Sequence, residues 1–83
     1  MNQKNDKGLA HGYWEHYYDH RNGELSGRGT YVNGNRHGYW EDYYHDGILN
    51  WKGHFNNEER TGYWEWHPPI INQYNRIEKE FYL

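Results

Sequence analysis

The 83-residue sequence predicts an all-β protein, an antiparallel meander of about three stacked β-hairpins in a single curled sheet. Three observations predict this fold. The tetrapeptide Gly-Tyr-Trp-Glu begins at Gly12, Gly38 and Gly62, and near-regular repetition is the signature of stacked structural units. Aromatic residues make up 20% of the chain, and Tyr, Trp and Phe favour strands. Asn-Gly and Asp-Gly steps lie between the aromatic runs, where tight hairpin turns need them.

The repeat organises residues 11–83 into one domain with units of about 11–36, 37–60 and 61–83. In each of the first two units, the Gly-Tyr-Trp-Glu strand is followed by a turn and a second strand. The turn of the first unit spans Asp19 to Gly23. Residues 1–10 are polar and predict an N-terminal arm that need not be ordered.

The end of the third unit allows two interpretations. Pro68 and Pro69 end the Gly-Tyr-Trp-Glu strand. Ile77 stands where Leu25 and Leu49 stand in the first two units, which favours a final strand through Phe81. Ile70, Tyr74, Ile77 and Phe81 also fall at helical spacing, so a short C-terminal helix is the alternative. The repeat itself favours the strand.

A register for the hairpins follows from the repeat. We expect the second hairpin to place Tyr44 opposite Leu49. Counting outward then puts a Glu opposite a basic residue and a Trp opposite a Gly, and the same two pairs recur in the first hairpin: Glu41–Lys52, Trp40–Gly53, Glu15–Arg28 and Trp14–Gly29. We expect each indole ring to lie over the glycine opposite it, because an aromatic ring shields the exposed backbone there.

Alternation along the strands separates the side chains onto two faces. The Trp face is the expected core and carries Trp14, Tyr18, Leu25, Gly29, Tyr31, Trp40, Tyr44, Leu49, Trp51, Phe55, Trp64 and Trp66. The Tyr–Glu face is the candidate partner-binding surface and carries Tyr13, Glu15, Tyr17, Arg28, Tyr39, Glu41, Tyr43, Lys52, Tyr63 and Glu65. Tyrosine is rigid and amphipathic, which suits a protein contact. High strand propensity alone is an equally good explanation of these tyrosines.

The histidines offer no clear metal site. His11 and His37 occupy matching positions before a glycine, which predicts a structural role where each strand begins. His16 and His20 lie four residues apart, a spacing that suits a metal on a helix but not on a strand that ends in a turn. The chain has no Cys, so it has neither a thiolate ligand nor a thiolate nucleophile. No metal-binding residue is predicted.

The carboxylates on the Tyr–Glu face do not form a convincing catalytic pair. Glu15, Glu41 and Glu65 lie two strands apart, or roughly 9–10 Å, at the outer edge of the separation used by inverting glycosidases. A basic residue opposite each of the first two keeps the carboxylate ionised, which suits a base but not its acid partner. The glycines are spaced for turns rather than for a phosphate loop. We therefore expect no enzymatic activity, no catalytic residue and no cofactor.

Net charge and hydropathy limit the classes of partner that the chain is expected to bind. Nine basic and twelve acidic residues give a formal charge of −3. This balance argues against nucleic-acid binding, which needs a basic face, and against adsorption to anionic membranes. No stretch approaches the roughly 20 apolar residues of a membrane helix. The polar residues at the start contain no signal segment, so we expect a cytoplasmic protein.

The motifs resemble the MORN repeat. The run Asn33-Gly34-Asn35-Arg36-His37-Gly38 before an aromatic strand, then Asp46-Gly47, then Trp51-Lys52-Gly53-His54-Phe55, looks like that repeat. The Gly-x-Trp form at Gly12, Gly38 and Gly62 is similar to bacterial MORN-like antitoxin components of toxin–antitoxin pairs. The resemblance covers about residues 11–67. The chain departs from the pattern at Gly27 and at Glu58-Glu59. The family implies stacked hairpins that bind proteins and, in some eukaryotic members, lipids.

The resemblance and the two faces together predict a non-enzymatic protein-interaction module. The leading expectation is an antitoxin or immunity-like protein that binds a protein partner through an aromatic sheet face. The alternative is a structural or accessory component of a phage, viral or other macromolecular assembly. A small ligand bound by the tyrosines, and a second copy of the chain as partner, are further candidates.

Overall fold

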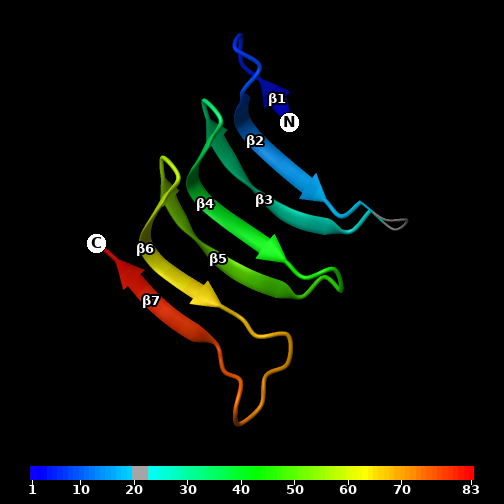
Figure 1. The fold of residues 1–83 in the computed structure, drawn as a ribbon, viewed down its shortest axis with the longest axis vertical. Helices are drawn as coiled ribbons and strands as arrows, with labels where there is room; N and C mark the ends of the chain where they lie inside the picture. Colours follow the sequence, from blue (N-terminus) through cyan, green and yellow to red (C-terminus); the bar gives the residue numbers. More distant parts are fainter. Residues whose placement is uncertain (20–22) are drawn as a thin grey trace.

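The computed structural model describes residues 1–19 and 23–83. The middle of the expected turn from Asp19 to Gly23, including His20, lies outside this part. Among the described residues, seven strands form one antiparallel sheet in chain order, which confirms the all-β meander (Figure 1). The strands are β1 (Gln3–Lys4), β2 (Ala10–Tyr17), β3 (Leu25–Val32), β4 (Asn35–Tyr43), β5 (Leu49–Asn56), β6 (Glu59–Trp66) and β7 (Glu78–Tyr82).

The two ends of the sheet settle two questions that the sequence leaves open. The C-terminal segment forms strand β7, which pairs with β6 through Tyr63 and Phe81, so the helical alternative is wrong. At the other end, residues 1–10 are not merely an arm. They add strand β1, in which Gln3 pairs with His11 of β2.

The tight turns follow from residues that tolerate a positive φ. Asn33 and Gly34, between β3 and β4, have φ values of 50° and 85°, the mirror-image turn whose twist matches a hairpin. Asn57 and Glu58 repeat this turn between β5 and β6, with φ values of 56° and 75°. Glu58 occupies a conformation that glycine prefers, and its carboxylate holds the Arg36 guanidinium at 2.7 Å.

The hairpin register is mostly as the sequence predicts. The pairs Trp14–Gly29, Glu15–Arg28, Trp40–Gly53 and Glu41–Lys52 are all confirmed. The expected pairing of Tyr44 with Leu49 is wrong, because a bulge after Asp42 places Tyr43 opposite Leu49 instead. The first hairpin contains the same bulge between His16 and Tyr17. An extra residue in one strand shifts the pairing beyond it by one position.

The indole rings lie over different glycines from those expected. A methyl group built on Gly29 would lie 2.2 Å from the ring of Trp40, and one built on Gly53 would lie 2.1 Å from the ring of Trp64. Each ring therefore covers the glycine of the preceding strand, not the glycine opposite it in the expected hairpin. The cause is a second bulge, between Arg28 and Thr30, that leaves Gly29 opposite three residues of β4, Gly38 to Trp40. Such bulges re-aim side chains.

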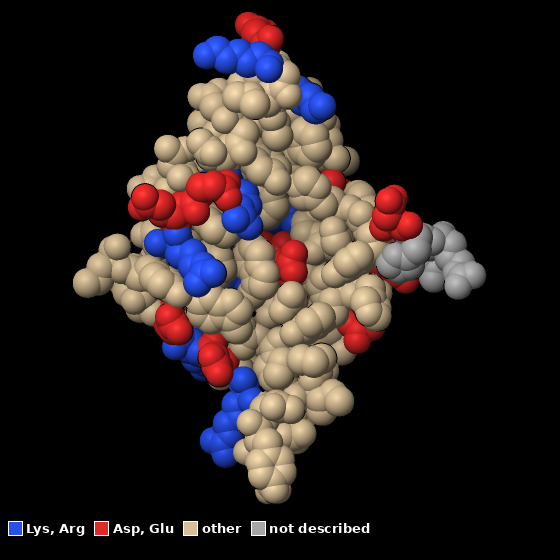
Figure 2. All heavy atoms as spheres, viewed as in Figure 1, with Lys and Arg blue, Asp and Glu red and all other residues tan. Residues whose placement is uncertain are grey.

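The core is a layer of rings on one sheet. The molecule measures 49 × 39 × 12 Å, so it has the thickness of a single sheet with its side chains. Trp40, Phe55 and Trp64 are 2–5% exposed. Tyr31, Trp51, Trp66 and Tyr82 pack around them. The expected Trp face is thus the core, and β7 contributes Tyr82 to it. On the face shown in Figure 2, charged groups of both signs gather mainly toward the rim.

Candidate interaction face

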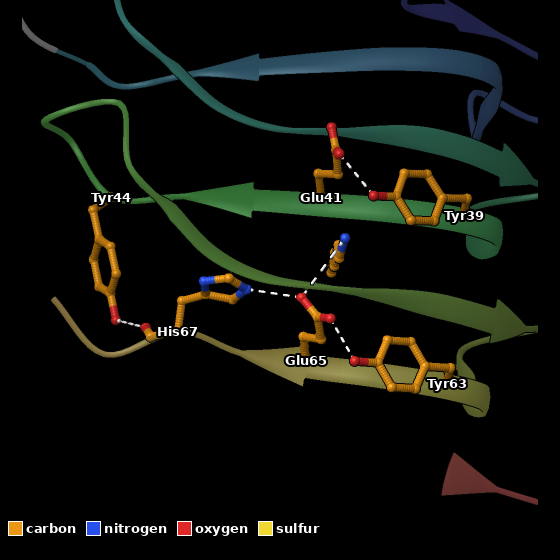
Figure 3. Close-up of polar contacts among 7 residues, drawn as sticks. Tyr39, Glu41, Tyr44, Tyr63, Glu65 and His67 are labelled. Carbon is orange, nitrogen blue, oxygen red and sulfur yellow. Dashed lines mark hydrogen bonds and ion pairs between the residues drawn. The ribbon is translucent and has the colours of Figure 1, made fainter. Parts of the chain in front are cut away.

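On the Tyr–Glu face, each glutamate is held by the residues two positions before and after it along its strand. In β4 the hydroxyls of Tyr39 (Figure 3) and Tyr43 donate to the two carboxylate oxygens of Glu41, at 2.7 and 2.6 Å. In β2 the hydroxyls of Tyr13 and Tyr17 hold Glu15 in the same way, at 3.0 and 2.5 Å. Residues i and i+2 of a strand share a face, which allows this contact. Each tyrosine side chain is therefore held at the backbone and, through its hydroxyl, at the glutamate.

The third unit repeats the arrangement with one substitution. Tyr63 donates to Glu65, and the Nε2 of His67 lies 2.9 Å from the same carboxylate (Figure 3). His67 thus stands where the other strands have a second tyrosine. The sequence analysis did not place His67 on this face. Its position four residues after Tyr63, equivalent to that of Tyr43 after Tyr39, is the signal that could have found it.

A row of alternating charge crosses six strands at right angles to these clusters. The register pairs each member with the next, from β2 to β7: Glu15, Arg28, Glu41, Lys52, Glu65 and Lys79. The sequence analysis missed Lys79 because the C-terminal strand was open to a second interpretation. Opposite charges placed directly across a ladder stabilise a sheet by roughly 0.2–1 kcal/mol a pair.

Arg28 and Lys52 each form an ion pair with the glutamate of the following strand. The Nε of Arg28 lies 2.6 Å from Glu41, although Arg28 also stands opposite Glu15 in the ladder. The Nζ of Lys52 likewise lies 3.6 Å from Glu65. The indole rings of Trp40 and Trp64 cover the glycines of the same strand pairs, β3–β4 and β5–β6. These two junctions are therefore joined on both faces of the sheet.

Hydrogen bonds keep the carboxylates ionised. The pKa of Glu65 is lowered to about 2, first by the hydroxyl of Tyr63 and then by His67. Burial alone would raise the pKa of Glu41, but the hydroxyls of Tyr43 and Tyr39 together with Arg28 lower it overall. The bond to Glu65 in turn raises the pKa of Tyr63 to about 12. Glu65 and Tyr63 therefore keep their protonation states across the neutral pH range.

We expect the sheet to lose stability in acid. A carboxyl whose pKa is lower in the folded than in the unfolded chain stabilises the fold above its unfolded pKa, and this contribution is lost as the pH falls through the folded value. For Glu65 the window runs from 4.5 down to about 2. The free energy of unfolding, measured by urea titration, should fall steadily between these values. Tyr63→Phe, which removes the hydroxyl, should show a weaker fall. A flat profile in wild type would contradict this prediction.

A row of exposed aromatic rings lies beside the charge row on this face. Tyr13, Tyr39 and Tyr63 are 41–44% exposed and Phe81 is 69% exposed. Tyr63 pairs directly with Phe81, and the ring of His54 lies 5.2 Å from that of Tyr39. All ten candidate residues thus belong to one surface, as their hydrogen bonds and ion pairs show. Phe81 and His54 extend it beyond the residues that the sequence indicates.

His11 and His37, which occupy matching positions in the repeat, support the hairpin turns. The backbone N–H of Asn33 donates to Nδ1 of His11 at 3.3 Å, and that of Asn57 donates to Nδ1 of His37 at the same distance. Each ring thus ties the turn of one hairpin to the strand that precedes that hairpin: β2 to the β3–β4 turn and β4 to the β5–β6 turn. Within residues 1–19 and 23–83, no three His, Asp or Glu side chains are grouped to hold a metal. This described part also contains no helix with the length and apolar character to cross a membrane.

Comparisons with known protein families, with curated protein sequences and with solved structures found no match to this chain.

Proposed function

We propose that this chain is a non-enzymatic interaction module that binds a protein partner through its Tyr–Glu face. The observation that carries the proposal is the row formed by Tyr13, Tyr39 and Tyr63, each more than two-fifths exposed and each bonded to a glutamate. Tyrosine is enriched in interfaces and in their energetic hot spots. In this chain the hydroxyl of each of these tyrosines is held by a hydrogen bond to a glutamate.

Rigidity supports a binding role for these rings. Immobilising a flexible side chain at an interface costs about 0.5–1.5 kcal/mol. The hydroxyl of Tyr39 is already held 2.7 Å from Glu41, so much of that cost is met in the free chain. The neighbouring charge row alternates in sign, which would fix the orientation and register of a partner more than its affinity.

An antitoxin or immunity-like role is the specific form that we favour. Masking a partner requires only a rigid surface that is complementary to it. The MORN-like motifs support this role, since similar bacterial repeats are antitoxin components. The partner would be a protein encoded beside this chain, and its copurification with the chain is the first observation to make.

Replacing Tyr39 and Tyr63 together by serine should weaken partner binding by roughly 2 kcal/mol or more, as for other central hot spots. The melting temperature should fall by only a few degrees, because both rings are partly exposed and lie on the face opposite the core. The measurement is affinity capture of the partner by each variant, followed by titration calorimetry. Tyr74→Ser is the matched control, because Tyr74 is 82% exposed but lies outside the strands. Equal capture by wild type and double variant would refute the proposal.

A structural or accessory role in a larger assembly is the second candidate. The outer edge of β7 favours it, because β7 is the last strand of an open sheet, and such an edge can pair with a strand of another protein. Lys79→Pro would remove a backbone donor from this edge strand. Loss of the partner with Lys79→Pro, but not with the tyrosine double variant, would favour this candidate.

A further inference from the structure

Two junctions between strands share one interlocking contact. At the β3–β4 junction the ring of Trp40 lies against Gly29, and its Nε1 donates to the carbonyl of Thr30 at 2.9 Å. At the β5–β6 junction the ring of Trp64 lies against Gly53, and its Nε1 donates to the carbonyl of His54 at 3.0 Å. A side chain at either glycine would overlap the ring. Where the accepting strand lacks a positive φ at this position, as at Gly29 and Gly53, the contact therefore requires glycine.

Strand β7 has the parts of such an accepting strand except for the glycine. Lys79 stands opposite Glu65 as Lys52 stands opposite Glu41. Tyr82 follows three residues later, as Phe55 follows Lys52, and Phe55 makes an edge contact with Trp64 at 5.0 Å. The position opposite Trp64 is Glu80, whereas the position opposite Trp40 is Gly53. Only this residue departs from the pattern in a way that prevents the contact.

At the opposite edge of the sheet, strand β2 carries the Gly-Tyr-Trp-Glu sequence that could dock onto an accepting strand, but the N-terminal strand β1 covers it. Trp14 of β2 donates its Nε1 to the carbonyl of Gln3 in β1 at 2.8 Å, the same contact that Trp40 and Trp64 make. Asn2 therefore occupies the place of the interlocking glycine, with a positive φ of 56° that neither Gly29 nor Gly53 has. Its N–H donates to Tyr13 and its side-chain amide bonds both the carbonyl and the N–H of Glu15. Strand β1 thus takes the site that β7 of a second copy would fill.

We propose that Glu80 is a stop residue that prevents β7 from accepting strand β2 of a second copy of this chain. The remaining contacts are complementary, since Lys79 would meet Glu15 of the next copy and Tyr82 would meet its Trp14. A heterologous contact of this kind repeats from copy to copy, so it would propagate head to tail into a filament or a ring. Repeat proteins need capping ends for this reason. Glu80 caps one end and β1 caps the other.

The test separates the side-chain volume of Glu80 from its charge. Glu80→Gly and Glu80→Ala both remove the charge, but only glycine leaves room for an indole ring. Each is combined with Asn2→Pro, which removes the bonds from Asn2 to β2. Sedimentation velocity over a concentration series should show chains of subunits for the glycine variant, with self-association at least about tenfold tighter than for the alanine variant. Adding Trp14→Ala to the glycine variant should return it to monomer.

Equal self-association of the glycine and alanine variants, or none in either, would overturn the proposal. A second measurement leaves β1 in place, in case Asn2→Pro unfolds the chain. A synthetic peptide of residues 10–17 is titrated into full-length Glu80→Gly and Glu80→Ala, and binding is followed by peptide fluorescence anisotropy. Tighter binding by the glycine variant, lost when alanine replaces Trp14 in the peptide, is the expected result. No difference between the two variants would again overturn the proposal.

Discussion

Replacing Trp64 by alanine should lower the free energy of unfolding by about 3–5 kcal/mol, the range for large aromatic residues in a core. Trp64 is 2% exposed. Its ring stacks on those of Trp51 and Trp66, with centroids 5.1 and 5.4 Å apart, and meets the edge of Phe55. Since domains of this size are stable by roughly 4–12 kcal/mol, the variant should lose a large share of the stability of the fold.

Urea titration followed by circular dichroism measures this effect without relying on tryptophan fluorescence. Ile70→Ala is the control, because Ile70 is 66% exposed and such a change usually shifts stability by less than about 0.5 kcal/mol. A loss below about 1 kcal/mol for Trp64→Ala would contradict the assignment of the Trp face as the core.

Replacing Gly53 by alanine should also destabilise the sheet, by about 1–3 kcal/mol or more. The added methyl group would lie 2.1 Å from the ring of Trp64, so the indole must move or the strands must separate. Overpacking of a rigid ring against backbone has no inexpensive relaxation. The same urea titration measures the loss.

A double-mutant cycle isolates the contact between Gly53 and Trp64. With Trp64 already replaced by alanine, the additional change Gly53→Ala should cost little, because no ring remains to obstruct the methyl group. The two changes should therefore be strongly non-additive. Additive effects would mean that the indole does not lie over this glycine in solution.

The fold was predictable because several local signals agreed. The three Gly-Tyr-Trp-Glu copies, the Asn-Gly turn at Asn33 and the alternation of the strands all indicated the same meander. The pairing of Glu41 with Lys52 followed from the repeat alone. The direction in which the indole rings point did not follow from the repeat, because a bulge sets that direction. Gly38 adopts a φ of 83° there, and a glycine in the sequence does not reveal which way the bulge turns.

The candidate face was predictable in its membership but not in its bonds. Alternation placed Tyr39, Glu41 and Tyr43 together, whereas the hydroxyl bonds between them depend on side-chain rotamers. Arg28 shows the same limit, since register allows it to pair with either of two glutamates and geometry selects Glu41. His67 and Phe81 were missed because the third unit departs from the residue types of the first two.

The central claim is that one face of the sheet holds the fold together while the other binds a partner. Hydroxyl-radical footprinting of the free chain and of its complex with the copurified partner tests both halves at once. The account predicts that Tyr13, Tyr39 and Tyr63 lose reactivity in the complex, whereas Tyr31 and Trp51 keep the reactivity that they have in the free chain. Protection of Tyr31 and Trp51, with the three exposed tyrosines unchanged, would contradict it.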